Sequence, residues 1–272
     1  MPIVTITRGS FGASRKVAAL IGRELDCKVL TREELLEHAR KYGVEETKLG
    51  ASDFFETNAP SLWDRHAAQR RRYLIYLKAS LLDFAATGNA VYLGNMGQFI
   101  LSDVPKLLRI RIDASMDFRM HGLMDESNLS ETQAKRQIKD IDATRRKWAK
   151  FLYDADFDSP RHYDMILNLE RMTVESASEV IACTLRRPEW KWDQATARTM
   201  KNLHLSAIVT AHLARSKRTR GMEVAVECDA QNGSAKVRGV PPLVGTTTWK
   251  HDIRDVVTEV EGIKSVEIVD QG

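Results

Sequence analysis

The chain contains few cysteines and no histidine cluster. Its 272 residues include three cysteines, Cys27, Cys183 and Cys228, which are scattered along the sequence. Since they lack the spacing of a metal site, we expect reduced thiols rather than disulfides or metal ligands. The seven histidines form no HxxxH or HExxH pattern, so the sequence predicts no structural metal.

Long apolar runs are also missing. No stretch approaches the ~20 residues that a transmembrane helix needs. Met1–Ile6 leads directly into a strand-like segment rather than into a secretory signal. We therefore expect a cytoplasmic protein without a membrane-bound part.

The excess of positive charge is small. With 41 Lys and Arg residues against 37 Asp and Glu residues, the formal net charge is +4. This balance suits anionic ligands such as nucleotides but is too weak to indicate nucleic-acid binding. Hydrophobic residues make up 43% of the chain, which is enough for a substantial core.

The chain does contain strand-like and helical segments that alternate as far as Arg186. The predicted strands are Pro2–Thr7, Cys27–Leu30, Ala90–Leu93, Leu107–Ile112 and Met165–Leu167. The predicted helices are Ser14–Leu25, Thr31–Ala39 with a capping box at its start, Leu62–Ala86, Gly97–Leu101, Met116–Met124, Ser130–Ile141 and Val174–Thr184. This alternation favours an α/β fold with a parallel sheet and helices on both faces.

The pattern changes after Arg186. Residues 187–195 include a proline and two tryptophans and are typical of a linker. The segments predicted beyond it are a helix, two strands, a helix and a strand: Thr196–Leu213, Val224–Cys228, Ala235–Gly239, Asp252–Val260 and Val266–Val269. The sequence therefore predicts two domains, 1–186 and 196–272, of which the second is a small α+β module.

A glycine-containing loop joins the first predicted strand to the first predicted helix. It reads TRGSFGASRK over residues 7–16, and backbone N–H groups at such a junction attract phosphate. Compared with the Walker A pattern GxxxxGK[ST], Ser14 stands at the second glycine, Arg15 at the lysine and Lys16 at the hydroxyl position. The loop alone leaves two interpretations open, a phosphate cradle or an ordinary turn with exposed basic residues.

Three segments resemble the cytidylate kinase-like family. The first, VTITRGSFGASRKVAALIGREL, resembles the opening of that family, which also carries arginine where Walker A has lysine. Two later segments, AVYLGNMGQFILSDVPKLLRIRIDASMDFRM and LSETQAKRQIKDIDATRRKWAKFLYDADFDSPRHYDMILNLERM, are similar to family segments in the same order and spacing. The resemblance covers about Pro2–Leu185. It implies a P-loop kinase-type fold that binds ATP with Mg²⁺ and transfers a phosphoryl group to a nucleotide or another small acceptor.

The resemblance also implies functional residues. The nucleotide and phosphate site would comprise Arg8, Gly9, Ser10, Gly12, Ala13, Ser14, Arg15 and Lys16. The catalytic residues would be Arg15, Arg119, Asp142 and Arg145. Arg119 would begin a mobile lid, and Asp142 with Arg145 would form its charged core, which suits a reaction that needs cations around a spreading negative charge. The acceptor side would include Arg32 and Asn95.

Three positions depart from the family pattern. Asn95 stands where the family has an arginine that grips the acceptor, Thr31 replaces an acid, and Lys16 removes the usual magnesium ligand. Two hypotheses therefore remain, a phosphotransferase of the nucleoside monophosphate kinase type or a nucleotide-binding sensor that has lost catalysis. The departures favour the sensor, whereas the retained lid residues favour the enzyme.

The C-terminal module is similar to the BON domain. The similarity lies in Asn232–Gly239 and Val260–Val266. It implies binding to a protein or to a membrane surface, and we expect the protein partner in preference to the membrane. Trp249, at the end of an insertion, is either an exposed contact or a packed side chain. The sequence leaves homo-oligomer formation open.

The long predicted helix Leu62–Ala86 carries four arginines, Arg65, Arg70, Arg71 and Arg72. Consecutive helical residues point in different directions, so at most two of these arginines can face one ligand. They form either a solvated face or a site for an acidic partner or effector.

Overall fold

The computed structural model describes residues 3–9, 11–44, 67–86, 88–240 and 248–270. These residues divide into two compact units. Within the described ranges, the first unit comprises residues 3–34 and 88–192, and the second comprises residues 35–44, 67–86 and 193–270. The second unit thus includes residues 35–44 and 67–86 as well as the C-terminal part, and the division into domains 1–186 and 196–272 stays a prediction.

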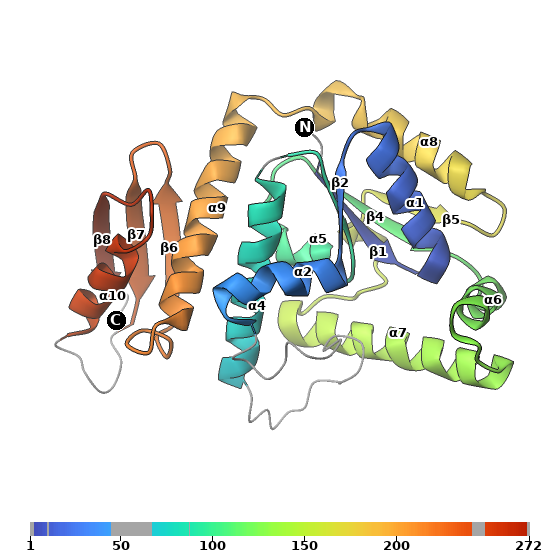
Figure 1. Ribbon diagram of the computed structural model, residues 1–272, viewed down its shortest axis with the longest axis horizontal. Helices are drawn as coiled ribbons and strands as arrows, with labels where there is room; N and C mark the ends of the chain where they lie inside the picture. The colour runs from blue at the N-terminus through green and yellow to red at the C-terminus, as the bar shows by residue number, and fades with distance from the viewer. Residues whose placement is uncertain (1–2, 10, 45–66, 87, 241–247, 271–272) are drawn as a thin grey trace. The chain divides into compact units, whose positions relative to one another are not determined.

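The first unit is built on a five-stranded sheet with the order β2-β3-β1-β4-β5 (Figure 1). The strands are β1 (Ile3–Arg8), β2 (Lys28–Thr31), β3 (Ala90–Leu93), β4 (Leu107–Asp113) and β5 (Met165–Asn168). Every neighbouring pair is parallel. The predicted parallel α/β sheet is confirmed, since each strand lies within one residue of its predicted bounds.

Helices lie on both faces of this sheet. The helices of this unit are α1 (Phe11–Glu24), α5 (Gly97–Ile100), α6 (Met116–Ser127), α7 (Glu131–Tyr153) and α8 (Val174–Leu185), while α2 (Arg32–Ala39) begins in this unit and continues into the second. On one face, Val17 of α1 and Ile181 of α8 share an apolar cluster with Val4 of β1. The next strand residue, Thr5, points to the opposite face, where a Cβ on Gly97 of α5 would lie 3.0 Å from its Cγ2 atom.

Helix α7 is longer than the sequence predicts. Its predicted start is confirmed by a capping box in which the backbone of Gln133 donates to the Ser130 hydroxyl and the Ser130 backbone donates back to the Gln133 side chain. The predicted end at Ile141 is wrong, because the helix continues to Tyr153. Ile141, Arg145 and Trp148 are buried at helical spacing, and the charged residues between them mask this stripe in the sequence.

The second unit combines helices with a small sheet. Its helices are α4 (Ala67–Ala85), α9 (Gln194–Arg215) and α10 (Trp249–Thr258), and its strands are β6 (Val224–Asp229), β7 (Ser234–Gly239) and β8 (Ser265–Asp270). Strand β7 pairs antiparallel with β6 and parallel with β8. The order of elements from α9 to β8 follows the sequence prediction, while the assignment of the module as a BON domain stays a prediction. None of the helices among the described residues carries an apolar stretch long enough to cross a bilayer.

The side chain of Trp249 belongs to the core of the second unit. It is 3% exposed and shares an apolar cluster with Val209 of α9 and Ile253 of α10. Its interpretation as an exposed contact is therefore wrong, and the packing alternative is confirmed. Gly233 and Gly262 have φ angles of 68° and 92°, a backbone conformation that glycine adopts without steric strain.

Candidate functional site

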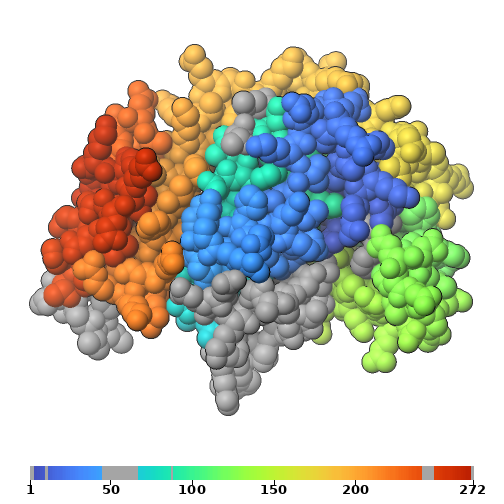
Figure 2. Space-filling view, in the orientation of Figure 1, coloured from blue at the N-terminus to red at the C-terminus, as the bar shows by residue number. Residues whose placement is uncertain are grey.

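The candidate site lies where β1 ends and α1 begins. Gly9 follows β1 directly, and a Cβ at this position would lie 1.9 Å from the carbonyl oxygen of Ile112 in β4. Only glycine allows the backbone of the loop to pass so close to the neighbouring strand. A Cβ on Gly12, in the first turn of α1, would lie 2.5 Å from a carboxylate oxygen of Glu126 in α6. Figure 2 shows α1 and α6 together at the surface of this unit.

A polar cavity of about 60 Å³ opens beside this loop. Its lining is rich in charge, with five arginines and three aspartates: Arg8, Arg111, Arg119, Arg145, Arg146, Asp113, Asp142 and Asp158. Thr7, Gly9 and Phe157 complete the lining. The excess of arginine over aspartate gives the cavity lining a net positive charge, which favours an anion over a cation.

Helices α6 and α7 contribute a buried ion-pair network to the cavity. Arg119 donates to both carboxylate oxygens of Asp142, at 2.8 Å each, in a bidentate pair. Arg145 donates to the backbone carbonyl of Arg8 at 2.8 Å and lies 3.8 Å from Asp142. Arg119 is 8% and Arg145 is 2% exposed, so both guanidinium groups are held in fixed positions at the end of β1.

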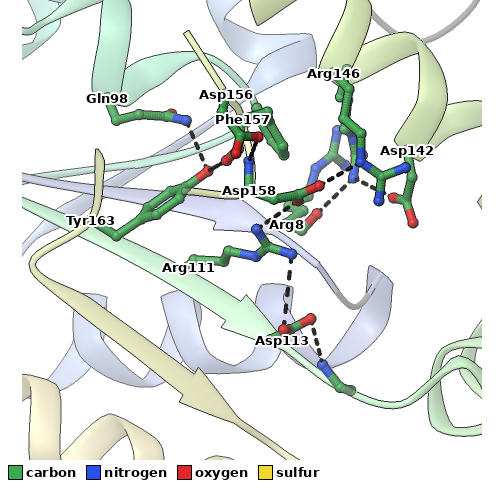
Figure 3. A network of polar contacts seen from close by, with 12 residues as sticks. Arg8, Gln98, Arg111, Asp113, Asp142, Arg146, Asp156, Phe157, Asp158 and Tyr163 are labelled. Atoms are coloured by element: carbon green, nitrogen blue, oxygen red, sulfur yellow. Dashed lines mark hydrogen bonds and ion pairs between the residues drawn. The ribbon is translucent and has the colours of Figure 1, made fainter. Parts of the chain in front are cut away.

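Strand β4 and the segment after α7 supply the opposite wall (Figure 3). Arg111 donates to Asp158 at 2.8 Å and lies 3.9 Å from Asp113, while Arg146 also donates to Asp158. Burial favours a higher pKa for Asp158, but the hydrogen bonds and charges of Arg146 and Arg111 outweigh it and lower the pKa. Asp158 is therefore a carboxylate that holds two arginines in place.

A chain of hydrogen bonds positions this wall against β1. The Thr7 hydroxyl donates to Gln98 at 3.1 Å, the Gln98 amide donates to the Tyr163 hydroxyl at 3.1 Å, and Tyr163 donates to the carbonyl of Phe157 at 2.9 Å. Burial is the main cause that raises the pKa of Tyr163 to about 12. Tyr163 therefore remains a neutral donor that fixes the segment carrying Asp158.

The structure brings together some of the predicted site residues. Those that line the cavity are Arg8, Gly9, Arg119, Asp142 and Arg145. Gly12 and Ala13 are half-buried in α1, and Ser14 is fully buried with no hydrogen-bond partner for its hydroxyl among the described residues. Ser10 lies outside the described residues.

Other predicted residues lie away from the cavity lining. Arg15 and Lys16 are exposed on α1, and neither lines the cavity. Arg32 and Asn95, predicted for the acceptor side, are 2% and 1% exposed and do not line it either. Their roles as donor-side and acceptor-side residues stay predictions.

Sequence reasoning missed four residues of the cluster. They are Arg111, Asp113, Arg146 and Asp158. The RIRID pattern of residues 109–113 contained a usable signal, because alternate residues of a strand share one face and Arg111 and Asp113 must therefore lie together. Arg146 belongs to a strongly charged stretch of sequence, and nothing local predicts that it donates to Asp158.

A model of one protein family matches residues 3–171, and that family is described as the cytidylate kinase-like family. The chain belongs to this family. Its first unit therefore has a nucleotide-binding, kinase-type α/β fold. An uncharacterized protein from Eubacterium ventriosum has the same fold, with a TM-score of 0.52 and 17% identity over 68% of this chain and 97% of that one.

Two further proteins are similar to this chain. A shikimate kinase from Bacteroides thetaiotaomicron matches with a TM-score of 0.42 and 10% identity over 69% of this chain and 100% of that one. A curated uronate isomerase from Corynebacterium glutamicum is 30% identical over 107 residues, 39% of this chain and 20% of the relative. The chain thus spans about a fifth of the length of that relative.

Proposed function

We propose that the protein is an ATP-dependent phosphotransferase of the nucleoside monophosphate kinase type, acting on a nucleotide or another small phosphate acceptor. The observation that carries this proposal is the cluster of five arginines and three aspartates beside the loop after β1. Phosphoryl transfer needs little covalent help from a protein but does need fixed positive charge around the transferring group. Arg119 and Arg145 supply that charge from α6 and α7.

The size of the cavity indicates what must move. A volume of about 60 Å³ has room for a group of phosphate size but not for a nucleotide. Two contacts between lining residues, from Arg145 to Arg8 and from Arg119 to Asp142, join α6 and α7 to each other and to the end of β1. We therefore expect α6 and α7 to open as a lid when nucleotide enters, and these arginines to exchange part of their present contacts for phosphate oxygens.

Magnesium fits this site only together with the phosphates. Among the described residues there is no group of three or more side chains that could hold a metal ion by itself. Asp142 and Asp158 are occupied by arginines, whereas Asp113 has one weak ion pair at 3.9 Å and accepts one hydrogen bond from the Ala114 backbone. Asp113 could hold one position of a Mg²⁺ ion whose other ligands are phosphate oxygens and water.

A second candidate function is a nucleotide sensor without catalysis. It is favoured by the neutral side chain of Asn95 in a buried position and by the exposure of Arg15 and Lys16 outside the cavity lining. In this case the BON-like module would report the bound state to a protein partner. Under either candidate we propose a cytoplasmic location, because the three cysteines are free thiols and nucleotides are available there.

The test is calorimetric titration with ATP, ADP and CMP in the presence of magnesium, followed by a coupled assay of ADP release. Binding with acceptor-dependent ADP release would establish the kinase, and tight binding without turnover would establish the sensor. Absence of binding would refute both. The loop has its own test, because Arg15→Ala should weaken ATP binding several-fold if Arg15 contacts the donor phosphates, and unchanged affinity would refute that role.

A further inference from the structure

A second cavity, of about 440 Å³, lies wholly within the second unit. It is bounded by the first half of α4, the end of α9 and residues 219–224, which lead into β6. Its volume is within the range of about 300–1,000 Å³ that is usual for small-molecule sites. None of its lining residues belongs to the arginine cluster of the first unit, so nothing in the phosphotransferase proposal accounts for it.

Most of the cavity wall is apolar. Ile75 of α4, Leu213 and Ala214 of α9, and Met222 and Val224 contribute apolar side chains. On the α4 side, Ala67 and Ala68 leave the space that larger residues would fill. A wall of this kind stabilises the apolar body of a ligand.

Three arginines also line this cavity, and their states differ. Arg71 is engaged, because it donates to Glu223 at 2.9 Å and to the carbonyl of Met222 at 3.4 Å. Arg220 is exposed. Arg72 is half-buried, its Nε atom is shielded from solvent, and it has no hydrogen-bond or ion-pair partner among the described residues.

The shielded Nε–H group of Arg72 costs free energy, because burial removes its water without replacing the lost hydrogen bond. An anion at this position would remove that cost. The planar guanidinium group matches the geometry of a phosphate or a carboxylate. Net charge favours the same ligand, because the lining holds three arginines and one glutamate, which is already paired with Arg71.

We propose that this cavity binds a small organic anion with an apolar body, whose phosphate or carboxylate group is bound by Arg72. The body of the ligand lies against Leu213 and Met222, and the anionic group lies at the N-terminal half of α4. On this proposal the second unit has a ligand site in addition to the phosphate site proposed for the first unit.

The experiment is fluorescence titration of the full chain with 8-anilinonaphthalene-1-sulfonate, an aromatic anion whose emission rises in an apolar site. Competition with phenyl phosphate and with benzoate then shows which anionic group the site prefers. Saturable binding is expected, and Arg72→Met should weaken it about tenfold because it removes a charge-assisted hydrogen bond while keeping an apolar stem. Arg254→Met is the matched control, since Arg254 is exposed in the same unit and lies outside the cavity lining.

A second variant keeps the proposal testable if Arg72→Met does not fold, as judged by circular dichroism. Ala68→Trp places a large side chain over the cavity at an exposed helical position, and it should abolish binding. Probe bound elsewhere, including the first unit, would be insensitive to both substitutions. The proposal is overturned if the wild-type chain shows no saturable binding, or if folded Arg72→Met or Ala68→Trp binds the probe as tightly as Arg254→Met does.

Discussion

Arginines line both cavities of this molecule, but most of those in the first cavity are paired with aspartates, whereas one of those in the second cavity has no partner among the described residues. In the first unit, Asp142 and Asp158 each bind an arginine at 2.8 Å, and the cavity is only about 60 Å³. In the second unit, Arg72 has no partner among the described residues and the cavity is about 440 Å³ with an apolar wall. Paired charges hold each other in place before a ligand arrives, whereas Arg72 has no protein group among the described residues to pair with and is the group that we propose binds a ligand.

The largest effect should come from the paired cluster. Arg119→Ala should lower the kcat of phosphoryl transfer about 1,000-fold, or about 4 kcal/mol, because the developing negative charge loses a fixed donor. The measurement is the coupled ADP-release assay with saturating substrates. Arg136→Ala is the matched control, because Arg136 lies on α7 with 86% of its side chain exposed. Equal rates for the two variants would show that the cluster has no part in catalysis.

The core of the second unit offers the next largest effect. Trp249→Ala should reduce the free energy of unfolding by about 3 kcal/mol, because it leaves a cavity among Val209, Ile253 and their neighbours. Urea unfolding followed by circular dichroism measures this loss. A change below about 1 kcal/mol would mean that the side chain is not packed as described.

The third largest effect concerns pH: acid should remove the stabilisation that Asp83 gives to the folded second unit. Nε2 of His204 lies 2.8 Å from its carboxylate, and Lys41 donates to the other oxygen. The hydrogen bond with His204, together with that of Lys41, outweighs burial and lowers the pKa of Asp83 from 3.8 to about 2. Because the folded-state pKa is the lower one, this stabilisation is complete above about pH 4 and disappears as the pH falls to about 2.

This shift corresponds to about 2 kcal/mol of unfolding free energy. Urea unfolding at a series of pH values from 5 to 2 would measure it, with Asp83→Asn as the comparison. The difference in stability between wild type and Asp83→Asn should shrink steadily over that interval. A difference that stays constant down to pH 2 would contradict the shift.

Sequence patterns predicted the first unit well because its elements are specified locally. The parallel strands follow from short apolar segments, and the start of α2 follows from the Thr31 and Glu34 capping box, whose two hydrogen bonds measure 2.8 and 3.3 Å. The end of α7 was not predicted, because its buried stripe includes Arg145, a residue type that is rarely fully buried.

The two cavities were less predictable because they depend on contacts between segments far apart in the sequence. The family resemblance implied Arg119, Asp142 and Arg145 as catalytic residues, but it did not predict that Arg111 pairs with Asp158, which needs β4 to lie beside the segment after α7. For the second cavity, the sequence left two interpretations of Arg65, Arg70, Arg71 and Arg72 open, a solvated face or a site for an acidic partner or effector. It could not identify Arg72 as the unpaired one, because that depends on which neighbours α9 and residues 219–224 place around it.

The smallest expected effects come from helix-cap variants, which test whether the two units unfold independently. Ser130 caps α7 in the first unit by accepting from Gln133, and Asp193 caps α9 in the second by accepting from Thr196 at 2.7 Å. Ser130→Ala and Asp193→Ala should each cost about 1 kcal/mol, because each leaves backbone N–H groups at a helix start without an acceptor. If the units unfold separately, thermal unfolding shows two transitions, and each variant lowers the midpoint of only one of them. If both variants lower the same single transition equally, the units unfold cooperatively. The two units would then be compact parts of one cooperative structure rather than independently stable domains.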